Sequence, residues 1–396
     1  MQHKVRISYY LSHPIQYFSP LLREMAKSFQ LQVYYFSDIS IKGGMDKGFG
    51  QNIKWDIPLL EGYNSCFIKN YSGSSSLDNR FWDLINPGVI KKLFDDPSSI
   101  IIMNGWSYCT SLIAIFFARL MGKKIWLRIE NPYSKEIRKR KHILWLKKLL
   151  LKHLLFRFFI DKCLYIGKDS KDFFKLYGVP DNRLIYTPYC VDNEYFHNAW
   201  LLYREKKTQL LQELNLPANR IIILFTGKYQ PVKRPIDLIK AYALLQSFNI
   251  ALVMVGEGEL RRDMETYIKD HKLQHIYLTG FVNQSQISRY YAIADMLVLC
   301  SESETWGLSV NEAMNFELPV VVSDTVGCSH DLVEQGKNGF IFERGNVQQL
   351  ADCLKQLIRD DSFRKEAGKL SLSTVQQYNT GVIIENVKIA AEEEEK

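Results

Sequence analysis

The sequence contains few cysteines, and they follow no recognisable pattern. Seven cysteines are scattered over 396 residues, their number is odd, and no Cys-x-x-Cys pair occurs. This arrangement argues against a disulfide framework and against a structural zinc site. It favours reduced thiols, and we therefore expect a cytoplasmic protein.

Long hydrophobic runs are also missing. The longest apolar run of the first half, residues 111–120, contains Arg119 and is too short to cross a bilayer. Residues 1–10 carry Lys4 and Arg6 inside an apolar stretch, which is typical of a first strand and not of a signal peptide. We therefore expect neither a membrane-spanning segment nor a leader sequence.

The composition is that of a globular protein with an uneven charge. Apolar residues make up 46% and charged residues 24% of the chain, and its length suits two domains. Residues 1–195 contain 29 Lys+Arg and 17 Asp+Glu, a net charge of +12, whereas residues 196–396 contain 22 and 26, a net charge of −4. We expect the first half to meet an acidic partner.

Strand and helix patterns alternate along the chain. In the first half, strands are expected at residues 5–11, 32–36, 100–103, 125–129, 163–166 and 184–187. In the second half, they are expected at residues 221–225, 251–255, 275–278, 296–299, 320–322 and 339–342. Helical patterns lie between them, and the longest covers residues 137–159. The alternation predicts an α/β fold with two doubly wound parallel sheets that face a central cleft, where ligands bind at the carboxyl ends of the strands.

The most informative stretch is residues 300–314. Glu304 and Glu312 stand eight residues apart, a strand precedes them, and a helix begins on small residues between them. Such a helix start offers backbone N–H groups to an anion. The two carboxylates can accept hydrogen bonds from hydroxyls on either side of that anion. A nucleotide-sugar, with sugar hydroxyls flanking a diphosphate, fits this pattern, and a solvated helix face is the alternative.

Five landmarks in this order resemble the signature of family 4 glycosyltransferases. They are the Glu-x7-Glu block with the Ala-Met and Pro-Val-Val that follow it, and residues 225–235, 255–259, 279–282 and 332–340. Together they cover about residues 225–342. The resemblance implies a GT-B fold with two Rossmann-like domains. It also implies a retaining hexosyltransferase that uses a UDP- or GDP-sugar.

The resemblance also divides the chain. The polar, aromatic stretch of residues 187–192 matches the place where the family's chain crosses between domains. We therefore expect an acceptor-binding domain at residues 1–188 and a nucleotide-sugar-binding domain at residues 189–374. A final helix within residues 375–396 is expected to pack back on the first domain.

The donor site follows by the same resemblance. Glu312 is expected to accept the ribose hydroxyls, and Glu304 to hold hydroxyls of the transferred sugar. The remaining donor-binding positions are Gly227, Phe281 and Val282, the last two beside the base, and Gly307, Leu308 and Ser309, whose N–H groups face the diphosphate.

The departing phosphate gains negative charge, which a metal or fixed cations must stabilise. No Asp-x-Asp occurs at the end of an expected strand, so we expect no metal and no other cofactor. Lys228 and Lys233 flank a strand-to-helix loop at a spacing of five, and Pro235 suits the first turn of the helix. We predict that these lysines are catalytic together with Glu304. The alternative is a pair of solvated loop lysines.

The first loop departs from the family, which usually has glycines there. Residues 13–17 read His-Pro-Ile-Gln-Tyr and resemble a subgroup of bacterial surface-polysaccharide transferases. His13 and Gln16 are candidates for contact with the phosphates or the acceptor. A capped turn with a packed histidine is the alternative.

Two other strand ends supply candidates for contact with the sugar or the acceptor. Glu130 and Asn131 stand where the family often has a histidine beside the donor sugar. Asn104 and Trp106 follow the strand at residues 100–103. Trp106 is expected either to stack on a sugar ring or to pack.

The helical segment of residues 135–162 is strongly basic. It holds ten Lys+Arg and two Asp+Glu among leucines, and it includes Trp145. An anionic membrane surface, nucleic acid and plain solvent are the three interpretations of this charge. No nucleic-acid motif accompanies it, so we expect a peripheral protein at the inner face of the plasma membrane.

The sequence thus predicts a cytoplasmic, metal-independent, retaining glycosyltransferase. Its expected acceptor is a glycan or a lipid-linked glycan in the synthesis of a bacterial surface polysaccharide such as lipopolysaccharide. A sugar-nucleotide epimerase of the same fold and a catalytically silent GT-B scaffold are the alternatives, and no nucleic-acid partner is expected.

Overall fold

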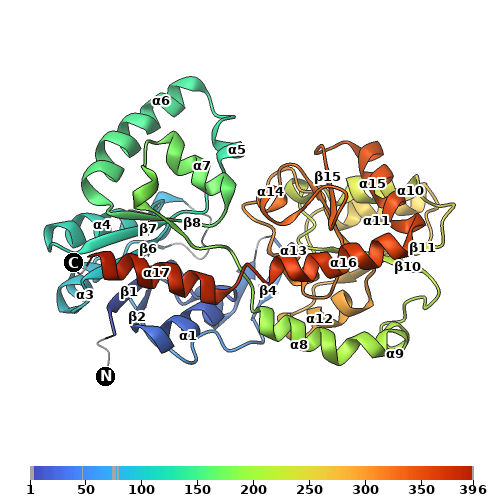
Figure 1. Cartoon of the computed structure of the whole chain (residues 1–396), viewed down its shortest axis with the longest axis horizontal. Coiled ribbons are helices and arrows are strands. Elements are labelled where there is room, and N and C mark those ends of the chain that lie inside the picture. Colours follow the sequence, from blue (N-terminus) through green and yellow to red (C-terminus); the bar gives the residue numbers. More distant parts are fainter. Residues whose placement is uncertain (1–3, 47, 74–76, 78–79, 395–396) are drawn as a thin grey trace. The chain divides into compact units, whose positions relative to one another are not determined.

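The chain forms two compact units (Figure 1). The computed structural model describes residues 4–46, 48–73, 77 and 80–394. Unit 1 contains Met1–Met45, Asn52–Tyr189 and Thr380–Lys396, and unit 2 contains Asp46–Gln51 and Cys190–Asn379. The expected domain boundary at residues 188/189 and the observed division at residues 189/190 differ by one residue.

Unit 1 is built on a seven-stranded sheet in the order β5-β2-β1-β6-β7-β8-β9, and its strand pairs are parallel. Its central strands are buried along most of their length because helices cover both faces of such a sheet. The strands are β1 (Arg6–Leu11), β2 (Gln30–Tyr35), β5 (Asn64–Phe67), β6 (Ile100–Asn104), β7 (Lys124–Arg128), β8 (Lys162–Tyr165) and β9 (Leu184–Tyr186). The first expected strand begins at Arg6, and residues 1–3 lie outside the described part.

The helices of unit 1 enclose one large apolar core between the sheet and α3, α4 and α7. They are α1 (Phe18–Ser28), α2 (Ile39–Lys42), α3 (Val89–Asp95), α4 (Cys109–Leu120), α5 (Tyr133–Glu136), α6 (Lys141–Leu150), a π-helix (Leu151–Phe159), α7 (Lys168–Leu176) and α17 (Thr380–Glu394). Short 3-10 turns lie at Phe81–Asp83 and Asp181–Arg183, and β3 (Gly44–Asp46) pairs with β4 (Gln51–Ile53) as a separate ribbon.

The last helix, α17, packs against α1 and β9. The side chain of Asn386 donates a hydrogen bond of 2.8 Å to the carbonyl of Tyr186. The expected helix started at residue 375, but the structure has α16 (Asp361–Val375), then a break, then α17. The break is stabilised by Asn193, whose amide donates to the carbonyls of Val375 and Tyr378 at 3.3 and 2.9 Å. Residues 395–396 of the expected helix lie outside the described part.

The prediction of a single helix over residues 137–159 is wrong. α5 ends at Glu136, Arg140 is extended at φ −59° and ψ 140°, α6 follows, and the chain then continues as a π-helix. The cause is the buried Glu136, which accepts hydrogen bonds from Lys139, Lys147 and Tyr177 at 2.8, 2.5 and 2.7 Å. These contacts hold the turn before α6, and helical periodicity cannot reveal them.

Unit 2 repeats the plan with a six-stranded sheet in the order β12-β11-β10-β13-β14-β15, again parallel. Its strands are β10 (Ile221–Thr226), β11 (Ile250–Val255), β12 (Ile276–Gly280), β13 (Met296–Leu299), β14 (Val320–Ser323) and β15 (Gly339–Phe342). Its helices are α8 (Asn193–Tyr203), α9 (Lys207–Glu213), α10 (Pro235–Ala243), α11 (Arg261–Asp270), α12 (Gln284–Ile293), α13 (Leu308–Met314), α14 (Ser329–Leu332), α15 (Val347–Arg359) and α16, with 3-10 turns at Arg204–Lys206 and Pro231–Lys233.

The two sheets confirm the expected pair of doubly wound α/β domains. In each sheet, the strand order reverses at one point, between β1 and β6 in unit 1 and between β10 and β13 in unit 2. Ligands of such sheets bind beyond the carboxyl ends of the strands at this point. The candidate donor residues lie in the loops that follow β10, β12 and β13 and in α13, and the other candidates lie at or beyond the ends of β1, β6 and β7.

Candidate active site

In unit 2, the loops after β10 and β13 bring Lys233 and Glu304 together. Lys233 ends the 3-10 turn before α10, and its ammonium group contacts Oε2 of Glu304 in an ion pair. Both side chains are largely buried. Burial, followed by the nearby charge of Lys228, lowers the pKa of Lys233 to about 8. The two predicted catalytic residues thus meet across 71 positions of sequence.

Lys228 lies in the same loop but has a different neighbour. Its Nζ atom stands 4.7 Å from the ring centre of Phe49, a residue of the short segment that belongs to unit 2. The ring of Phe49 makes an edge contact with Phe281, with centroids 4.9 Å apart. Phe49 therefore connects a predicted phosphate residue with a predicted base residue. No motif in the sequence indicates this contact.

Glu312 lies in the second turn of α13 and is only 4% exposed. The hydroxyl of Tyr291 donates to Oε2 at 2.6 Å, and the amide of Gln284 donates to Oε1 at 3.4 Å. The Thr226 hydroxyl stands 3.1 Å from that of Tyr291 and extends this network to the end of β10. Glu312 therefore does not belong to a solvated helix face. The role of Tyr291 was missed because the Glu-x7-Glu pattern does not include it.

Glycines allow the loops to approach the site. Gly307, the residue before α13, has φ 101°, and a β-carbon there would lie 2.9 Å from Val326 and 3.0 Å from Leu299. At Gly256, after β11, a β-carbon would lie 1.9 Å from the carbonyl oxygen of Gly227. Only glycine fits such positions. The backbone of Gly307, Leu308 and Ser309 opens α13, as the sequence predicted.

Phe281 and Val282 lie between β12 and α12. The side chain of Asn283 accepts a hydrogen bond of 2.9 Å from the N–H of Gln284 and so fixes the start of α12. The two residues are thereby held beside the helix that carries Gln284 and Tyr291. Their predicted contact with a base stays a prediction.

Sequence reasoning also missed an arginine cluster beside the Lys233 loop. Arg234 has φ 49°, and its guanidinium pairs with Asp237 at 2.6 Å and with Glu302 at 2.8 Å. Arg344 contacts the other oxygen of Glu302. These ion pairs join the loop after β10 to the loops after β13 and β15. The positive φ next to Pro235 was not foreseeable from the motif.

In unit 1, the first loop places His13 beside Ser12, with Oγ 2.9 Å from Nδ1. Burial lowers the pKa of His13 to about 4, so its imidazole is neutral at pH 7. Gln16 lies in the same loop, directly before α1. The structure leaves both interpretations of this loop, ligand contact and capped turn, in place.

The end of β7 carries a buried cation that the sequence analysis did not single out. Arg128 is 2% exposed, and its guanidinium lies 4.9 and 5.2 Å from the ring centres of Phe18 and Tyr189. Its Nε atom stands 3.7 Å from Oε1 of the predicted site residue Glu130. Burial raises the pKa of Glu130, and Arg128 acts in the opposite direction. The predicted site residue Asn131 follows in the same loop.

The two candidates at the end of β6, Asn104 and Trp106, have different surroundings. Asn104 has a buried Oδ1 atom with no hydrogen-bond partner among the described residues. Trp106 packs against the core of unit 1, and Nζ of Lys147 stands 5.9 Å from its ring centre. Trp106 is only partly buried, so its predicted contact with a sugar ring stays a prediction.

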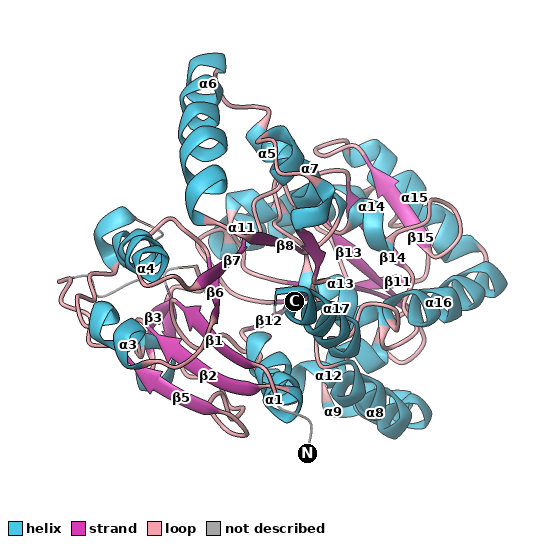
Figure 2. Ribbon diagram, turned by 60° about the vertical axis from the view of Figure 1, so that its left-hand side comes forward, coloured by secondary structure: helices cyan, strands magenta, loops and turns pink. Residues whose placement is uncertain are grey.

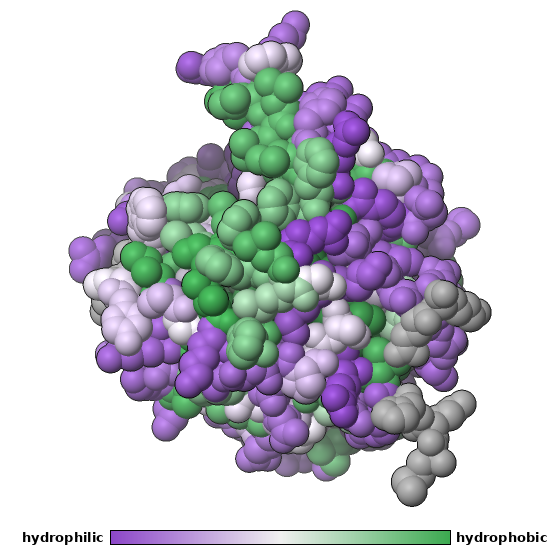
Figure 3. All heavy atoms as spheres, turned by 90° about the vertical axis from the view of Figure 1, so that its left-hand side faces the viewer, coloured by the Kyte–Doolittle hydropathy of each residue, from purple (hydrophilic) through white to green (hydrophobic). Residues whose placement is uncertain are grey.

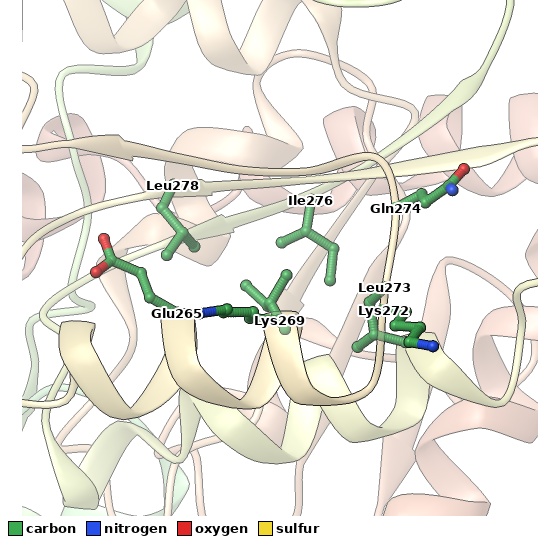
Figure 4. A pocket seen from close by; sticks show the side chains of 8 residues that line it. Glu265, Lys269, Lys272, Leu273, Gln274, Ile276 and Leu278 are labelled. Carbon is green, nitrogen blue, oxygen red and sulfur yellow. The ribbon is translucent and has the colours of Figure 1, made fainter.

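A surface hollow of about 540 Å³ lies elsewhere in unit 2, between α11 and the edge strand β12 (Figure 4). It is lined by Glu265, Ile268, Lys269, Lys272, Leu273, Gln274, Ile276 and Leu278. None of the predicted site residues lines it. In the described part of the chain, no three His, Cys, Asp or Glu side chains are grouped as metal ligands.

Comparison with known proteins shows which sequences and structures this chain resembles. Residues 206–371 match the family model of glycosyl transferases group 1. N-acetyl-alpha-D-glucosaminyl L-malate synthase of Bacillus anthracis is 25% identical over 209 residues, which are 52% of this chain and 53% of that protein. Sulfoquinovosyl transferase SQD2 of Arabidopsis thaliana is 30% identical over 212 residues, which are 53% and 40% of the two chains. The chain spans about half or less of the length of these relatives.

Solved structures match nearly the whole chain. Anabaena Alr3699/HepE in complex with UDP and glucose has a TM-score of 0.72 at 18% identity, covering 98% of this chain and 99% of that one. Sucrose-phosphate synthase of Thermosynechococcus elongatus has a TM-score of 0.69 at 17% identity, again covering 98% and 99%. The chain therefore has the GT-B fold.

Proposed function

We propose that this protein is a glycosyltransferase that moves a hexosyl group from a nucleoside-diphosphate sugar to a glycan or a lipid-linked glycan. The observation that carries the proposal is the ion pair of Lys233 and Glu304 at the point where the strand order of unit 2 reverses. Glu312 is linked to the same point, because Tyr291 joins it to Thr226 at the end of β10. Those residues lie within the part that matches the glycosyl transferase model. The UDP-bound structure of HepE supports a nucleotide-sugar donor.

Donor binding is proposed to begin at Glu312. Tyr291 holds one carboxylate oxygen at 2.6 Å, which orients the group. We infer that the ribose hydroxyls replace the longer contact of 3.4 Å from Gln284 to the other oxygen. A charged acceptor in a buried position gives strong hydrogen bonds, so this contact would supply much of the affinity for the nucleotide.

Lys233 and Lys228 are proposed to stabilise the leaving diphosphate. Without donor, the ammonium group of Lys233 is neutralised by Glu304. With donor bound, we infer that the diphosphate takes over Lys233 and that Glu304 turns to hydroxyls of the transferred sugar. Fixed cations that face developing charge are worth about 3–4 kcal/mol in the transition state. They would perform the task that a metal has in other transferases.

The proposed transfer is of the retaining type and needs no carboxylate nucleophile. The bond between the anomeric carbon and the phosphate oxygen breaks, and the acceptor oxygen bonds to that carbon on the same face. The acceptor's hydroxyl proton passes to the leaving phosphate. The products are a lengthened glycan and a free nucleoside diphosphate.

The acceptor is proposed to belong to a cell-surface polymer made at the inner face of the plasma membrane. Poly(ribitol-phosphate) alpha-N-acetylglucosaminyltransferase of Staphylococcus aureus, 31% identical over 169 residues, supports this class of acceptor. No helix in the described part of the chain has both the length and the apolar character required to span a membrane.

Thermal-shift screening of UDP- and GDP-sugars tests the proposed donor first. One nucleotide-sugar should raise the melting temperature of the natural protein, and the rise should be lost in Glu312→Gln. The stabilised donor is then incubated with and without glycan acceptors. Nucleoside diphosphate should be released only when an acceptor is present, and conversion of the sugar without an acceptor would instead favour an epimerase.

A further inference from the structure

Helix α6 is apolar and yet buries none of its side chains. Six of its ten residues are Ile, Leu or Trp, and none of the ten is buried. Figure 2 shows α6 projecting beyond the sheet of unit 1. A helix of a globular protein normally packs its apolar stripe on a core. The side chains of α6 therefore require a partner outside the core of unit 1.

The exposed side chains form one continuous surface, here called the apolar face. Trp145, Leu146 and Leu150 are 65%, 61% and 52% exposed. The members of the apolar face are Ile143, Trp145, Leu146, Leu149, Leu150, Leu154 and Phe158. Figure 3 shows hydrophobic atoms gathered along this projection and on the surface below it. The region extends to α4, because Phe116 is exposed there and its ring lies 6.2 Å from that of Phe159.

Lysines run along one side of the apolar face. Lys141, Lys148 and Lys152 are spaced by seven and four residues, so they share one side of the helix, and all three are exposed. Among the described residues, no ion pair includes any of them. Lys139 and Lys147 differ, because both bind Glu136 and are used within unit 1. None of the three interpretations of the basic segment therefore describes these two lysines, which stabilise unit 1 itself.

We propose that the apolar face and its lysines dock on an anionic lipid surface. Exposed leucines and a tryptophan suit the boundary between headgroups and acyl chains, and lysine side chains beside them can reach anionic headgroups. Nucleic acid would use the cations but leave the leucines in water. A second copy would bring the same cations against each other, since a symmetric contact pairs identical surfaces. An anionic membrane offers acyl chains to the side chains of the apolar face and negatively charged headgroups to the lysines.

Vesicle flotation tests the proposal without nucleotide or acceptor, so its outcome is independent of the proposed activity. The protein should float with vesicles of phosphatidylcholine and phosphatidylglycerol, and much less with phosphatidylcholine alone. High ionic strength should release it. Each cation near an anionic surface strengthens binding about fivefold, so Lys141→Gln/Lys148→Gln/Lys152→Gln should weaken it by about two orders of magnitude. Equal binding to both vesicle types, or to neither, would overturn the proposal.

A second pair of variants separates the apolar contribution from folding. Leu146→Gln/Leu150→Gln should lose flotation while its melting temperature stays unchanged, because neither side chain is buried. Leu201→Gln/Leu202→Gln on α8 is the matched control, since both leucines are also exposed, and it should float normally. If the α6 variant floats as well as the control, the apolar face does not dock on lipid.

Fluorescence quenching locates the contact on α6. Vesicles that contain phosphatidylglycerol with brominated acyl chains should quench the emission of Trp145, and the quenching should disappear in Trp145→Phe. If Trp145→Phe is quenched as strongly as the natural protein, this residue does not enter the lipid. A dimer in sedimentation analysis that Leu146→Gln/Leu150→Gln dissociates, without any vesicle binding, would instead assign the apolar face to self-association.

Discussion

In unit 2, the cations around the candidate site are held by carboxylates, whereas in unit 1 the lysines of α6 stand beside exposed leucines. Lys233 pairs with Glu304, and Arg234 with Asp237 and Glu302. Lys141 and Lys148 are exposed next to the apolar face. Cations thus have two different environments in this chain. Paired and partly buried cations suit the small anion that we propose as ligand, and exposed lysines beside an apolar face suit an extended anionic surface.

The largest expected effect is on catalysis by the buried pair. Lys233→Ala should lower kcat by about two to three orders of magnitude, because a preorganised donor to the leaving phosphate is removed. Steady-state kinetics with the identified donor and acceptor measures this change. Lys337→Ala is the control, since Lys337 is exposed and pairs only with Glu334 among the described residues. Equal kcat values for the two variants would exclude a catalytic role of Lys233.

A pair of neighbouring leucines tests the contrast between buried and exposed positions in unit 1. Leu151 is 0% exposed and Leu150 is 52% exposed. Leu151→Ala should lower the free energy of unfolding by at least about 2 kcal/mol, because it leaves a cavity. Leu150→Ala should change it by less than about 0.5 kcal/mol. Urea unfolding measures both. A similar loss for Leu150→Ala would mean that α6 is packed and available for no partner.

A smaller effect is expected on nucleotide binding. Glu312→Gln should weaken the binding of the free nucleoside diphosphate by about tenfold to a hundredfold, since hydrogen bonds to a charged group are worth about 1.5–3 kcal/mol. Tyr291→Phe keeps the charge but loses the orienting hydroxyl, so its loss should be smaller. Calorimetry measures both affinities. Unchanged affinity in Glu312→Gln would remove this residue from the donor site.

The smallest expected effect is a pH dependence. Because the pKa of Lys233 is lowered to about 8, its ammonium group loses its proton above that pH in the free protein. The value of kcat/KM for the donor should then fall about tenfold per pH unit above pH 8, since it reports the free enzyme. Lys233→Arg stays charged in this range, so its profile should be flat there. If kcat/KM of Lys233→Arg falls at the same pH, the group that titrates is not Lys233.

The strand and helix patterns predicted every strand of both sheets except β5, because the central strands of a parallel sheet are covered on both faces and largely apolar. β5 lies at the edge of its sheet and is not buried, so it lacks this pattern. The landmark at residues 225–235 also located the loop after β10, and the Glu-x7-Glu block located the loop after β13. The contacts that complete the site were not predictable, since they join residues far apart in sequence. Lys233 meets Glu304, Tyr291 meets Glu312, and Phe49 reaches Lys228. In unit 1, periodicity predicted one helix where the buried carboxylate of Glu136 imposes a break.

The most direct test of the central claim is to follow transfer from the identified nucleotide-sugar to a glycan acceptor by NMR, in excess chelator. The product should contain a new glycosidic bond with the anomeric configuration of the donor. Nucleoside diphosphate should appear in equal amount, at the same rate with and without chelator. Inversion at the anomeric carbon, activity that only a divalent ion restores, or release of nucleotide without an acceptor would contradict it.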